Sequence, residues 1–514
     1  MRITLVGLVL AVGLATAACG GDDDNSGPVD SSAPQKAGGE ITVAHPLAPS
    51  SLDPIAGSSG GDQMSLYPIF DRLVNFDPAT LEPQPGLATS WEYPDPQTLV
   101  LTLQEGVTFQ DGTPFDAEAV KASLERAMDA EISKVATDLG MIESIDATSP
   151  TEVTIHLNRP DASLVLILAD RAGMIVSPTA VQEEGADFAA HPVGTGPYSF
   201  DSYTPNDQLV VKKNDDYWRD GKPYLDQITF KYFTDQQTAN NALQSDQADI
   251  VLNADLADIS TLEKMSGVEV VSQPSLLTDG CYLNFSRAPF DDQLARQAIA
   301  YAIDRDALNK SYAFGEAEPT SEVFPAGYWA ADPDLQDTFG HDTDKASDLL
   351  AQAGHEDGLS ITGVTFQDTG EVRKMEIIQE QLKEVGIDLQ FEVFDPATVA
   401  QKFFTEHSFD IACASWSGRP DPSQTANSLF LSTSFYNAGS YAAPGMDEAL
   451  TAAASAQTQE ARAEAFSTIT ELNQEYVMWI PTLSEPNVTA ISDKVQGLSP
   501  NFYGKIDVSF LSLR

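Results

Sequence analysis

The chain has 514 residues, of which 28 are Lys or Arg and 77 are Asp or Glu, so its formal net charge is −49. A hydrophobic content of 42% is enough for large folded cores and excludes a wholly disordered chain. The acidic surplus excludes a nucleic-acid partner, because binding to phosphates needs a surplus of Lys and Arg. With three cysteines, the chain has neither a disulfide scaffold nor a CxxC pair for zinc or redox chemistry.

The first residues are typical of an export signal. A basic start at Arg2 precedes an apolar run over residues 3–18, which is shorter than the roughly 20 residues that span a bilayer. The run ends in small residues directly before Cys19 and resembles a bacterial lipobox, although Thr16 stands where the usual pattern has Leu. The resemblance implies that residues 1–18 are a lipoprotein signal peptide and that Cys19 carries a diacylglyceryl anchor, with plain secretion as the alternative.

The residues after this cysteine predict a tether. Residues 19–39 are rich in Gly, Asp and Ser and almost free of apolar side chains, which is typical of a flexible linker. No later segment has the ~18 consecutive apolar residues that a membrane span needs. We therefore expect the folded part to begin near Glu40 and to lie outside the cytoplasmic membrane, in the periplasm where an outer membrane exists.

Helical and strand periods alternate from residue 40 onwards. Asp116 predicts the N-cap of a helix that runs to residue 128, and Asp292 predicts another helix start. The clearest unit is a helix with apolar residues at helical spacing over residues 375–385, which Gly386 ends. An alternating strand over residues 387–393 follows it. A helix, a glycine and a strand in this order predict an α/β fold.

One short motif has the pattern of a serine hydrolase. Gly57-Ser58-Ser59-Gly60-Gly61 matches G-x-S-x-G, in which Ser59 would be the nucleophile. That chemistry needs a strand directly before the motif, whereas residues 51–56 contain a proline and no strand pattern. The favoured interpretation is a Gly/Ser loop that exposes backbone N–H groups to a ligand.

No metal site or cofactor is expected from the motifs. The six histidines have neither HxxxH nor HExxH spacing, and the aspartates between Asp332 and Asp344 do not fit an EF-hand loop. Cys281 and Cys413 lie on two predicted strands, and an extracytoplasmic location permits a disulfide between them. Because the strand pairing is unknown, free buried thiols are the favoured interpretation and a bridge is the alternative.

Six segments together resemble the family 5 extracellular solute-binding proteins of ABC importers, the dipeptide, oligopeptide and nickel group. They occur in the family's order, and the resemblance runs from about residue 40 to residue 514. The segments are residues 107–121 (VTFQDGTPFDAEAVK), 192–200 (PVGTGPYSF), 214–226 (NDDYWRDGKPYLD), 243–249 (LQSDQAD), 288–304 (APFDDQLARQAIAYAID) and 345–354 (KASDLLAQAG).

The resemblance implies a bilobal α/β fold of the type II periplasmic-binding-protein kind, with an extra third lobe and interleaved domains. Lobe Ia would combine residues 40–76, 192–276 and 484–514, lobe Ib would be residues 77–191, and lobe II would be residues 277–483. The crossings near residues 275–279 and 481–484 would form the hinge.

The function that the resemblance implies is transport. A monomeric substrate-binding subunit would capture a small solute, a peptide or peptide-like molecule, between its lobes and deliver it to an ABC permease and ATPase complex. No bond is made or broken in such a subunit, so we expect no enzymatic activity. The alternatives are a chemosensory or signalling receptor on the same fold and, from another class, a secreted serine hydrolase.

The residue that sets ligand charge departs from the family's pattern. In peptide-binding members, Trp-x-Gly-Asp presents an aspartate to the α-ammonium of the peptide, whereas this chain has Trp416, Ser417, Gly418 and Arg419. A guanidinium repels an ammonium and can hold a carboxylate or phosphate, so the resemblance implies an anionic group on the ligand. Alternatively, Arg419 pairs with Asp421 or another carboxylate as part of the loop. The candidate ligand-binding residues are Ser58, Ser59, Gly60, Gly61, Tyr328, Trp329, Trp416, Ser417, Gly418, Arg419 and Tyr441.

Overall fold

A computed structural model describes residues 36–57, 61–499 and 501–514. The expected signal peptide, Cys19, most of the expected tether and residues 58–60 therefore lie outside the described residues. Within the described ranges, no helix has the combination of length and apolar character that crossing a bilayer requires. The described residues from Lys36 to Arg514 form one compact unit.

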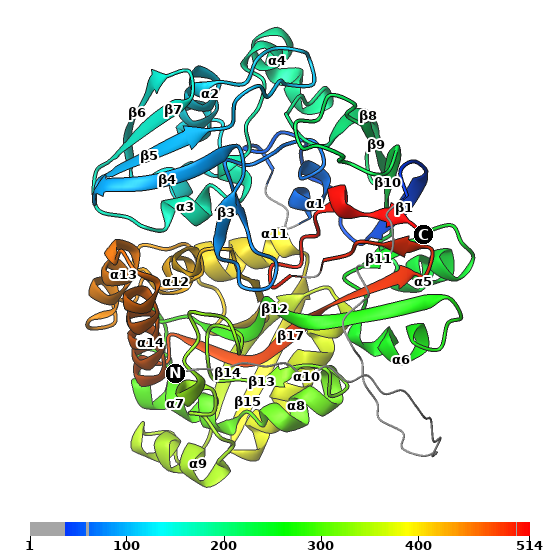
Figure 1. Ribbon diagram of the computed structural model, residues 1–514. Helices are drawn as coiled ribbons and strands as arrows, with labels where there is room; N and C mark the ends of the chain where they lie inside the picture. Colours follow the sequence, from blue (N-terminus) through cyan, green and yellow to red (C-terminus); the bar gives the residue numbers. More distant parts are fainter. Residues whose placement is uncertain (1–35, 58–60, 500) are drawn as a thin grey trace, which may run out of the picture. The chain divides into compact units, whose positions relative to one another are not determined.

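The largest element of this unit is an 11-stranded mixed sheet (Figure 1). Strands β14 and β15 are parallel, as are β1 and β10, whereas the central strands pair antiparallel with their neighbours. In spatial order the strands are β15 (Ile387–Phe394), β14 (Leu359–Phe366), β16 (Ile411–Ser417), β12 (Val268–Leu283), β17 (Trp479–Ser492), β11 (Ile250–Leu252), β1 (Glu40–His45), β10 (Gln227–Tyr232), β9 (Gln208–Lys213) and β8 (Tyr198–Thr204), with β13 (Glu318–Pro319) beside β17.

Two long central strands join the two halves of this sheet. β12 and β17 pair from Val268 opposite Ser492 to Tyr282 opposite Trp479. Their register shifts between Pro274 and Leu277, where the resemblance to the family implies that the chain passes through the hinge. A register shift bends the strand that carries it and leaves groups free for other partners. Here the freed amide of Leu276 donates to the carbonyl of Phe502, at 2.7 Å.

A separate sheet has the order β4-β5-β7-β6 and its own hydrophobic core. It comprises β4 (Ala88–Asp95), β5 (Thr98–Leu103), β6 (Ile142–Ser149) and β7 (Glu152–Leu157), and helix α2 (Ala117–Met128) packs against β6 and β7. The carboxylate of Asp116 accepts from the Ala119 amide at 3.0 Å, so Asp116 is the N-cap that the sequence predicts. Val120 and Leu124 are fully buried on the inner face of α2.

The helix–glycine–strand unit is confirmed in the large sheet. Helix α10 (Thr369–Glu384) buries Met375, Ile378 and Leu382, and Gly386 follows it with φ of 84°, which favours glycine. Strand β15 then pairs in parallel with β14, so β14, α10 and β15 form a β-α-β unit. The helix start that Asp292 predicts is also confirmed, because Asp292 caps α7 (Gln293–Ala302).

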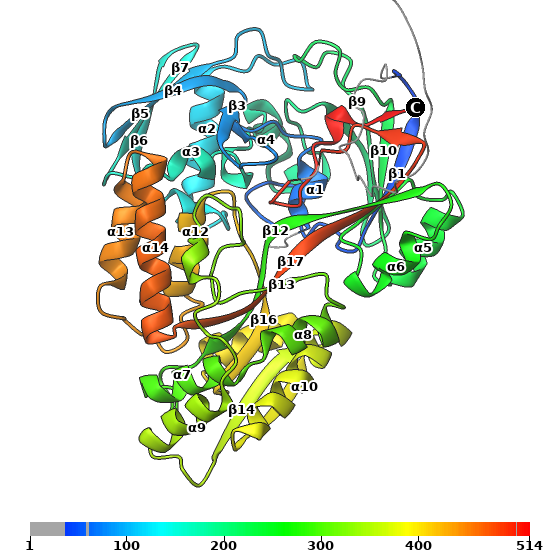
Figure 2. The same ribbon diagram turned by 60° about the horizontal axis from the view of Figure 1, so that its bottom comes forward.

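The remaining elements surround these sheets. Figure 2 shows α12 (Pro422–Phe430), α13 (Met446–Ser455) and α14 (Gln459–Tyr476) as one group, which packs helix against helix. The other α-helices of the described residues are α1 (Asp62–Leu66), α3 (Leu164–Ile167), α4 (Pro178–Glu184), α5 (Gln236–Gln244), α6 (Ile259–Leu262), α8 (Arg305–Tyr312), α9 (Thr343–Gln352) and α11 (Pro396–Val399). Two short strand pairs are β2 (Val74–Phe76) with β3 (Pro83–Pro85) and β18 (Val495–Gln496) with β19 (Ser512–Leu513).

Cys281 and Cys413 form a disulfide, so the expectation of free thiols is wrong. Cys281 lies on β12 and Cys413 on β16, as predicted, and the two are directly opposite each other in the antiparallel register, with their Cα atoms 4.0 Å apart. The bridge is fully buried and closes a sequence separation of 132 residues. Sequence patterns predict the two strands but not that these strands are neighbours.

Removal of this bridge should lower the free energy of unfolding by about 2–5 kcal/mol, because the disulfide restricts a long loop in the unfolded chain. Chemical denaturation of the oxidised and the fully reduced protein measures the difference. The double variant Cys281→Ala/Cys413→Ala is the control, because its denaturation midpoint should not respond to reductant. A fully reduced wild-type protein with an unchanged midpoint would contradict this expectation.

Candidate ligand-binding site

A large cavity lies beside the paired strands β12 and β17. Its volume is about 700 Å³, within the range of about 300–1,000 Å³ that small-molecule sites occupy. The walls come from five segments that are far apart in sequence: residues 46–47, 253–257, 275–277, 485–488 and 502–505, together with Tyr312, Phe314, Ser417 and the first turn of α10. Both halves of the large sheet therefore contribute to the cavity.

The cavity wall carries aromatic rings and charges of both signs. The rings are Tyr312, Phe314, Phe502 and Tyr503. The charged side chains are Asp255, Asp368, Arg373, Glu485 and Lys505. Burial, and secondarily the nearby Arg419, lower the pKa of Lys505 to about 8. A wall of this kind can bind a polar ligand that has both cationic and anionic groups.

A smaller cavity of about 190 Å³ contains Arg419. Its other walls include Gln63, Asp138, Asp170 and Arg171. Burial acts to lower the pKa of the Arg419 guanidinium, but the nearby Tyr503, Asp170 and Asp138 outweigh this effect, so the pKa is raised. Arg419 is therefore fully charged inside a partly desolvated space.

The local fold fixes where Arg419 lies. β16 ends at Ser417, and the amide of Gly418 then donates to the carbonyl of Leu276 on β12 at 2.8 Å. A Cβ atom on Gly418 would lie 2.8 Å from the Cβ of Leu276, so this close approach requires glycine. The guanidinium of Arg419 turns back and donates to the carbonyl of Ser417 at 2.9 Å.

Arg419 does not pair with Asp421, so that interpretation is wrong. Asp421 is buried and receives two hydrogen bonds from Arg462, at 2.7 and 2.9 Å. It also caps α12 by accepting from the Ser423 amide at 2.9 Å, as its position before Pro422 suggests. Among the described residues, no carboxylate lies within ion-pair distance of Arg419. The charge of Arg419 is therefore not neutralised by its own loop.

The structure places the other candidate residues in different surroundings. Ser417 lines the large cavity, whereas Trp416 donates its ring N–H to Thr425 at 3.2 Å and packs edge-to-face on Tyr436. Tyr328 is buried and donates to the carbonyl of Pro420 at 2.9 Å. It contributes to the support of the Arg419 loop and does not line either cavity.

Two further aromatic candidates are half-buried and pack against the hydrophobic core. Trp329 contacts Phe466, and Tyr441 stacks on Phe285 with ring centroids 4.9 Å apart. Neither ring lines the two cavities. Gly61 is buried, and a Cβ atom there would meet Leu47, which lines the large cavity. The other three loop candidates, Ser58, Ser59 and Gly60, lie outside the described residues.

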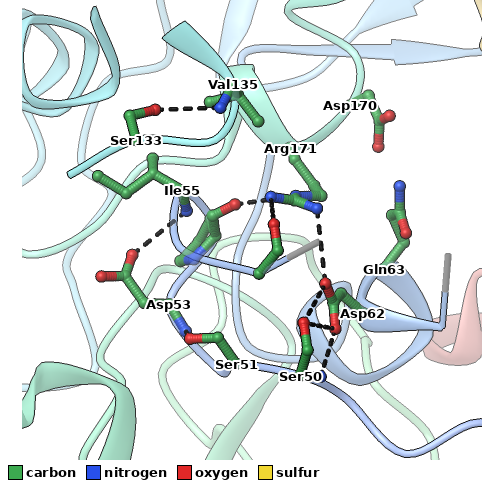
Figure 3. A network of polar contacts seen from close by, with 12 residues as sticks. Ser50, Ser51, Asp53, Ile55, Asp62, Gln63, Ser133, Val135, Asp170 and Arg171 are labelled. Atoms are coloured by element: carbon green, nitrogen blue, oxygen red, sulfur yellow. Dashed lines mark hydrogen bonds and ion pairs between the residues drawn. The ribbon is translucent and has the colours of Figure 1, made fainter. Parts of the chain in front are cut away.

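A polar network holds both flanks of this loop (Figure 3). Arg171 donates to the carbonyl of Pro54 at 2.9 Å, donates to the carbonyl of Gly57, and forms an ion pair with Asp62 at 3.5 Å. Asp62 also accepts from the amide of Ser50 at 2.6 Å. Because Arg171 itself lines the smaller cavity, the network fixes the loop flanks beside that cavity.

Tyr503 connects the two cavities. Its ring lines the large cavity, and its hydroxyl donates to Asp170, on the wall of the smaller one, at 2.8 Å. Gln63 donates to the same hydroxyl oxygen at 2.9 Å. Sequence reasoning missed Tyr503, Lys505, Asp170 and Arg171, because no local motif marks them and only the folded chain brings them next to Arg419.

The described residues contain no cluster of three or more His, Cys, Asp or Glu side chains that could hold a metal ion. His45, the most buried histidine of the cavity region, has a pKa lowered to about 4 by burial and by Lys505. It is therefore neutral at physiological pH. What the site offers is a set of fixed charges and aromatic surfaces around enclosed space.

Comparisons with known proteins show the family to which this chain belongs. The family model for bacterial extracellular solute-binding proteins, family 5 Middle, matches residues 82–437. The glutathione-binding protein GsiB of Escherichia coli O1:K1 is 31% identical over 470 residues, which cover 89% of this chain and 91% of that protein. GsiB of Shigella flexneri serotype 5b is 30% identical over 470 residues, which again cover 89% of this chain and 91% of that protein.

Solved structures of the same fold give the same assignment. The ABC transporter-associated periplasmic binding protein DppA from Helicobacter pylori, in complex with the peptide STSA, has a TM-score of 0.82 at 25% identity and covers 93% of this chain and 98% of its own. A dipeptide-binding protein from a Pseudoalteromonas species, in complex with Met-Leu, has a TM-score of 0.82 at 23% identity, with 93% and 100% coverage. The chain belongs to family 5 of the bacterial extracellular solute-binding proteins and has their type II periplasmic-binding-protein fold.

Proposed function

We propose that this chain is the substrate-binding subunit of a peptide-type ABC importer, which captures a peptide or peptide-like solute that carries an anionic group. The observation that carries the proposal is Arg419, a charged guanidinium in a cavity, without an ion-pair partner among the described residues. The printed names of the relatives support a peptide-like ligand, since they are glutathione-binding and peptide-binding proteins.

The proposed mechanism is closure of two lobes over the ligand. We assign lobe Ia to residues 40–76, 192–276 and 484–514, lobe Ib to residues 77–191, and lobe II to residues 277–483. The four-stranded sheet with its own core supports the assignment of lobe Ib. The long paired strands β12 and β17 support a hinge where they run from one lobe to the other. A ligand closes the lobes only if it binds the closed form more tightly than the open form, and the closed form then docks on the permease.

The anionic group has a defined place in this proposal. Arg419 would hold it from lobe II, in a protein whose net charge of −49 repels anions at long range. That repulsion is screened over about 8 Å at physiological salt, so the guanidinium acts as a short-range contact. Lys505, on the wall of the large cavity and near enough to Arg419 for its pKa to be affected, adds a second cation.

The location and partners follow from the first residues. We propose that residues 1–18 are removed, that Cys19 is lipidated, and that residues 19–39 tether a monomer to the outer face of the cell membrane, beside the permease and ATPase complex. A chemosensory or signalling role on the same fold is the second candidate, and permease and ATPase genes next to this gene would favour transport. Enzymatic activity is not part of the proposal, because this family consists of binding proteins.

Replacement of Arg419 tests the function directly. Native mass spectrometry first identifies the solute that co-purifies with the protein, and isothermal titration then measures its affinity. Arg419→Ala should cost about 2–5 kcal/mol of binding free energy, mostly as a faster off-rate, because a desolvated charge pair is lost. Arg419→Lys should recover only part of this energy, since an ammonium cannot form the planar two-bond contact.

Two controls make this measurement specific. Arg159→Ala removes an exposed arginine that lines neither cavity, and its affinity should equal that of the wild type. Arg462→Ala leaves Asp421 buried without its partner and should reduce stability by about 3–5 kcal/mol, whereas Arg419→Ala should not. If folded Arg419→Ala protein binds the solute as tightly as the wild type does, the anionic contact is absent and Arg419 only shapes its loop.

Replacement of Cys19 tests the anchor. Cys19→Ala should release the protein into the medium or the periplasm and leave ligand affinity unchanged, because the lipid would be lost while the folded part stays intact. Fractionation of cells followed by immunoblotting of the membrane and soluble fractions measures the release. Cys19→Ala protein that remains in the membrane fraction would show that the anchor lies elsewhere.

A further inference from the structure

A buried cluster of charges lies beside the paired strands β12 and β17. The ammonium of Lys374, on α10, is 2.6 Å from Asp279 on β12 and 3.0 Å from Glu371 on α10. Ser415 on β16 donates to both carboxylates. Lys374 and Asp279 are 1% and 0% exposed, so neither charge is balanced by water.

A third carboxyl group joins this cluster from the other central strand. Glu485 is on β17, directly opposite Leu277, and is 8% exposed. It lines the 700 Å³ cavity. Its carboxyl group shares a hydrogen bond with that of Asp279, which lies behind it. Glu485 therefore brings a carboxyl group of the cluster to the wall of the proposed ligand cavity.

The charges of this cluster do not cancel. One ammonium faces three carboxyl groups, and two uncompensated negative charges are costly at buried positions. Burial and the adjacent Asp279 raise the pKa of Glu485 well above its ordinary value. Burial acts to raise the pKa of Asp279, but Lys374 and the hydrogen bonds from Glu485 and Ser415 together outweigh it, so the pKa of that group is lowered. The protonated form of Glu485 is therefore favoured, and Asp279 is the ionised partner of Lys374.

The surroundings of Glu485 are acidic on the side that faces the cavity. Asp255 and Asp368 line the same wall, and burial together with nearby Asp258 and Asp368 raises the pKa of Asp255. Tyr312 on α8 lines the same cavity as an uncharged neighbour of Glu485, since burial raises the pKa of its hydroxyl. The cations that line the cavity are Arg373 and Lys505, so the three carboxyl groups outnumber them.

We propose that Glu485 is the subsite for a primary ammonium group of the ligand, and that this ammonium replaces the proton of the Glu485 carboxyl when it binds. The proposal deepens the proposed function, on which it rests, because it gives the peptide's positive end a site away from the anion-binding Arg419. Glu485 releases its proton to solvent and pairs as a carboxylate with the ligand. In this proposal, Glu485 on β17 takes the role that the aspartate of the Trp-x-Gly-Asp loop has in peptide-binding family members.

This exchange has two measurable consequences. Binding of an ammonium-bearing ligand should release up to one proton and should tighten as the pH rises through the range in which Glu485 is protonated. Without ligand, the raised pKa means that the stabilisation due to protonated Glu485 is complete below the ordinary pKa of a glutamate, about 4.3, and is lost as the pH rises through the folded value. Glu485→Gln keeps the neutral shape of the side chain and should remove both pH dependences.

The test compares matched probes by isothermal titration: glutathione, the dipeptide Met-Leu, and the N-acetylated form of each, which lacks the ammonium. For whichever free-amine probe binds the wild type, its acetylated form should bind about 30-fold more weakly or worse. Glu485→Gln should weaken the free-amine probe by a similar factor and leave the acetylated one unchanged. Titration in phosphate and in Tris, which differ in ionisation enthalpy, counts the protons released. Glu380→Gln, an exposed residue of α10, is the matched control and should behave like the wild type.

Each other result has a defined meaning. Equal affinities of the free and acetylated probes, or an unchanged affinity of Glu485→Gln, overturn the ammonium subsite. Loss of binding in Asp368→Asn but not in Glu485→Gln also overturns the ammonium subsite, and it assigns the ammonium to Asp368 at the start of α10. If Arg419→Ala weakens the probe while Glu485→Gln does not, only the subsite fails. If none of the four probes binds, the peptide-type function fails, and the subsite fails with it.

Discussion

The antiparallel pairing of β12 with β17 is the constraint on which the rest of the structure depends. These two strands hold both halves of the large sheet together, and their register shift at residues 275–276 opens the backbone to the segment around Phe502. The same segment brings Tyr503 and Lys505 to the cavity wall. β16 pairs with β12, ends at the close contact between Gly418 and Leu276, and so directs Arg419 into the smaller cavity. The positions of the groups that line the two cavities therefore follow from strand pairing.

Charge is distributed along the cavities in a way that suits a ligand with two unlike ends. Arg419 and Arg171 line the smaller cavity together with Asp138 and Asp170, whereas the large cavity has three carboxyl groups and two cations, Arg373 and Lys505. The overall charge of −49 does not show that both signs of charge occur at each cavity. An extended peptide has its ammonium and its carboxylate at opposite ends, and the two cavities offer complementary charges in two places.

The sequence predicts local structure well where one segment carries the whole signal. Asp116 and Asp292 cap helices, and Gly386 ends α10, because a cap needs only its own neighbours. The disulfide between Cys281 and Cys413, the Asp421–Arg462 pair and the Asp279–Lys374 pair depend on contacts between distant segments, which no local pattern shows. For the site, Arg419 and Ser417 could be found through the resemblance to family members, whereas Glu485, Tyr503 and Asp170 could not. Trp329, Tyr328 and Tyr441 are candidates that line neither cavity. The sequence could not exclude them, because an aromatic residue has the same sequence signal in a core as in a cavity.

The cross-strand disulfide ties the geometry of binding to the compartment in which the chain folds. The bridge fastens β16, which ends at the Arg419 loop, to the central strand β12. Thiols stay reduced in the bacterial cytoplasm and are oxidised outside it. A newly made chain that waits for export therefore lacks the fastening beside its cation, and only the exported chain acquires it. Formation of the bridge beside the Arg419 loop is in this way coupled to passage of the chain out of the cytoplasm.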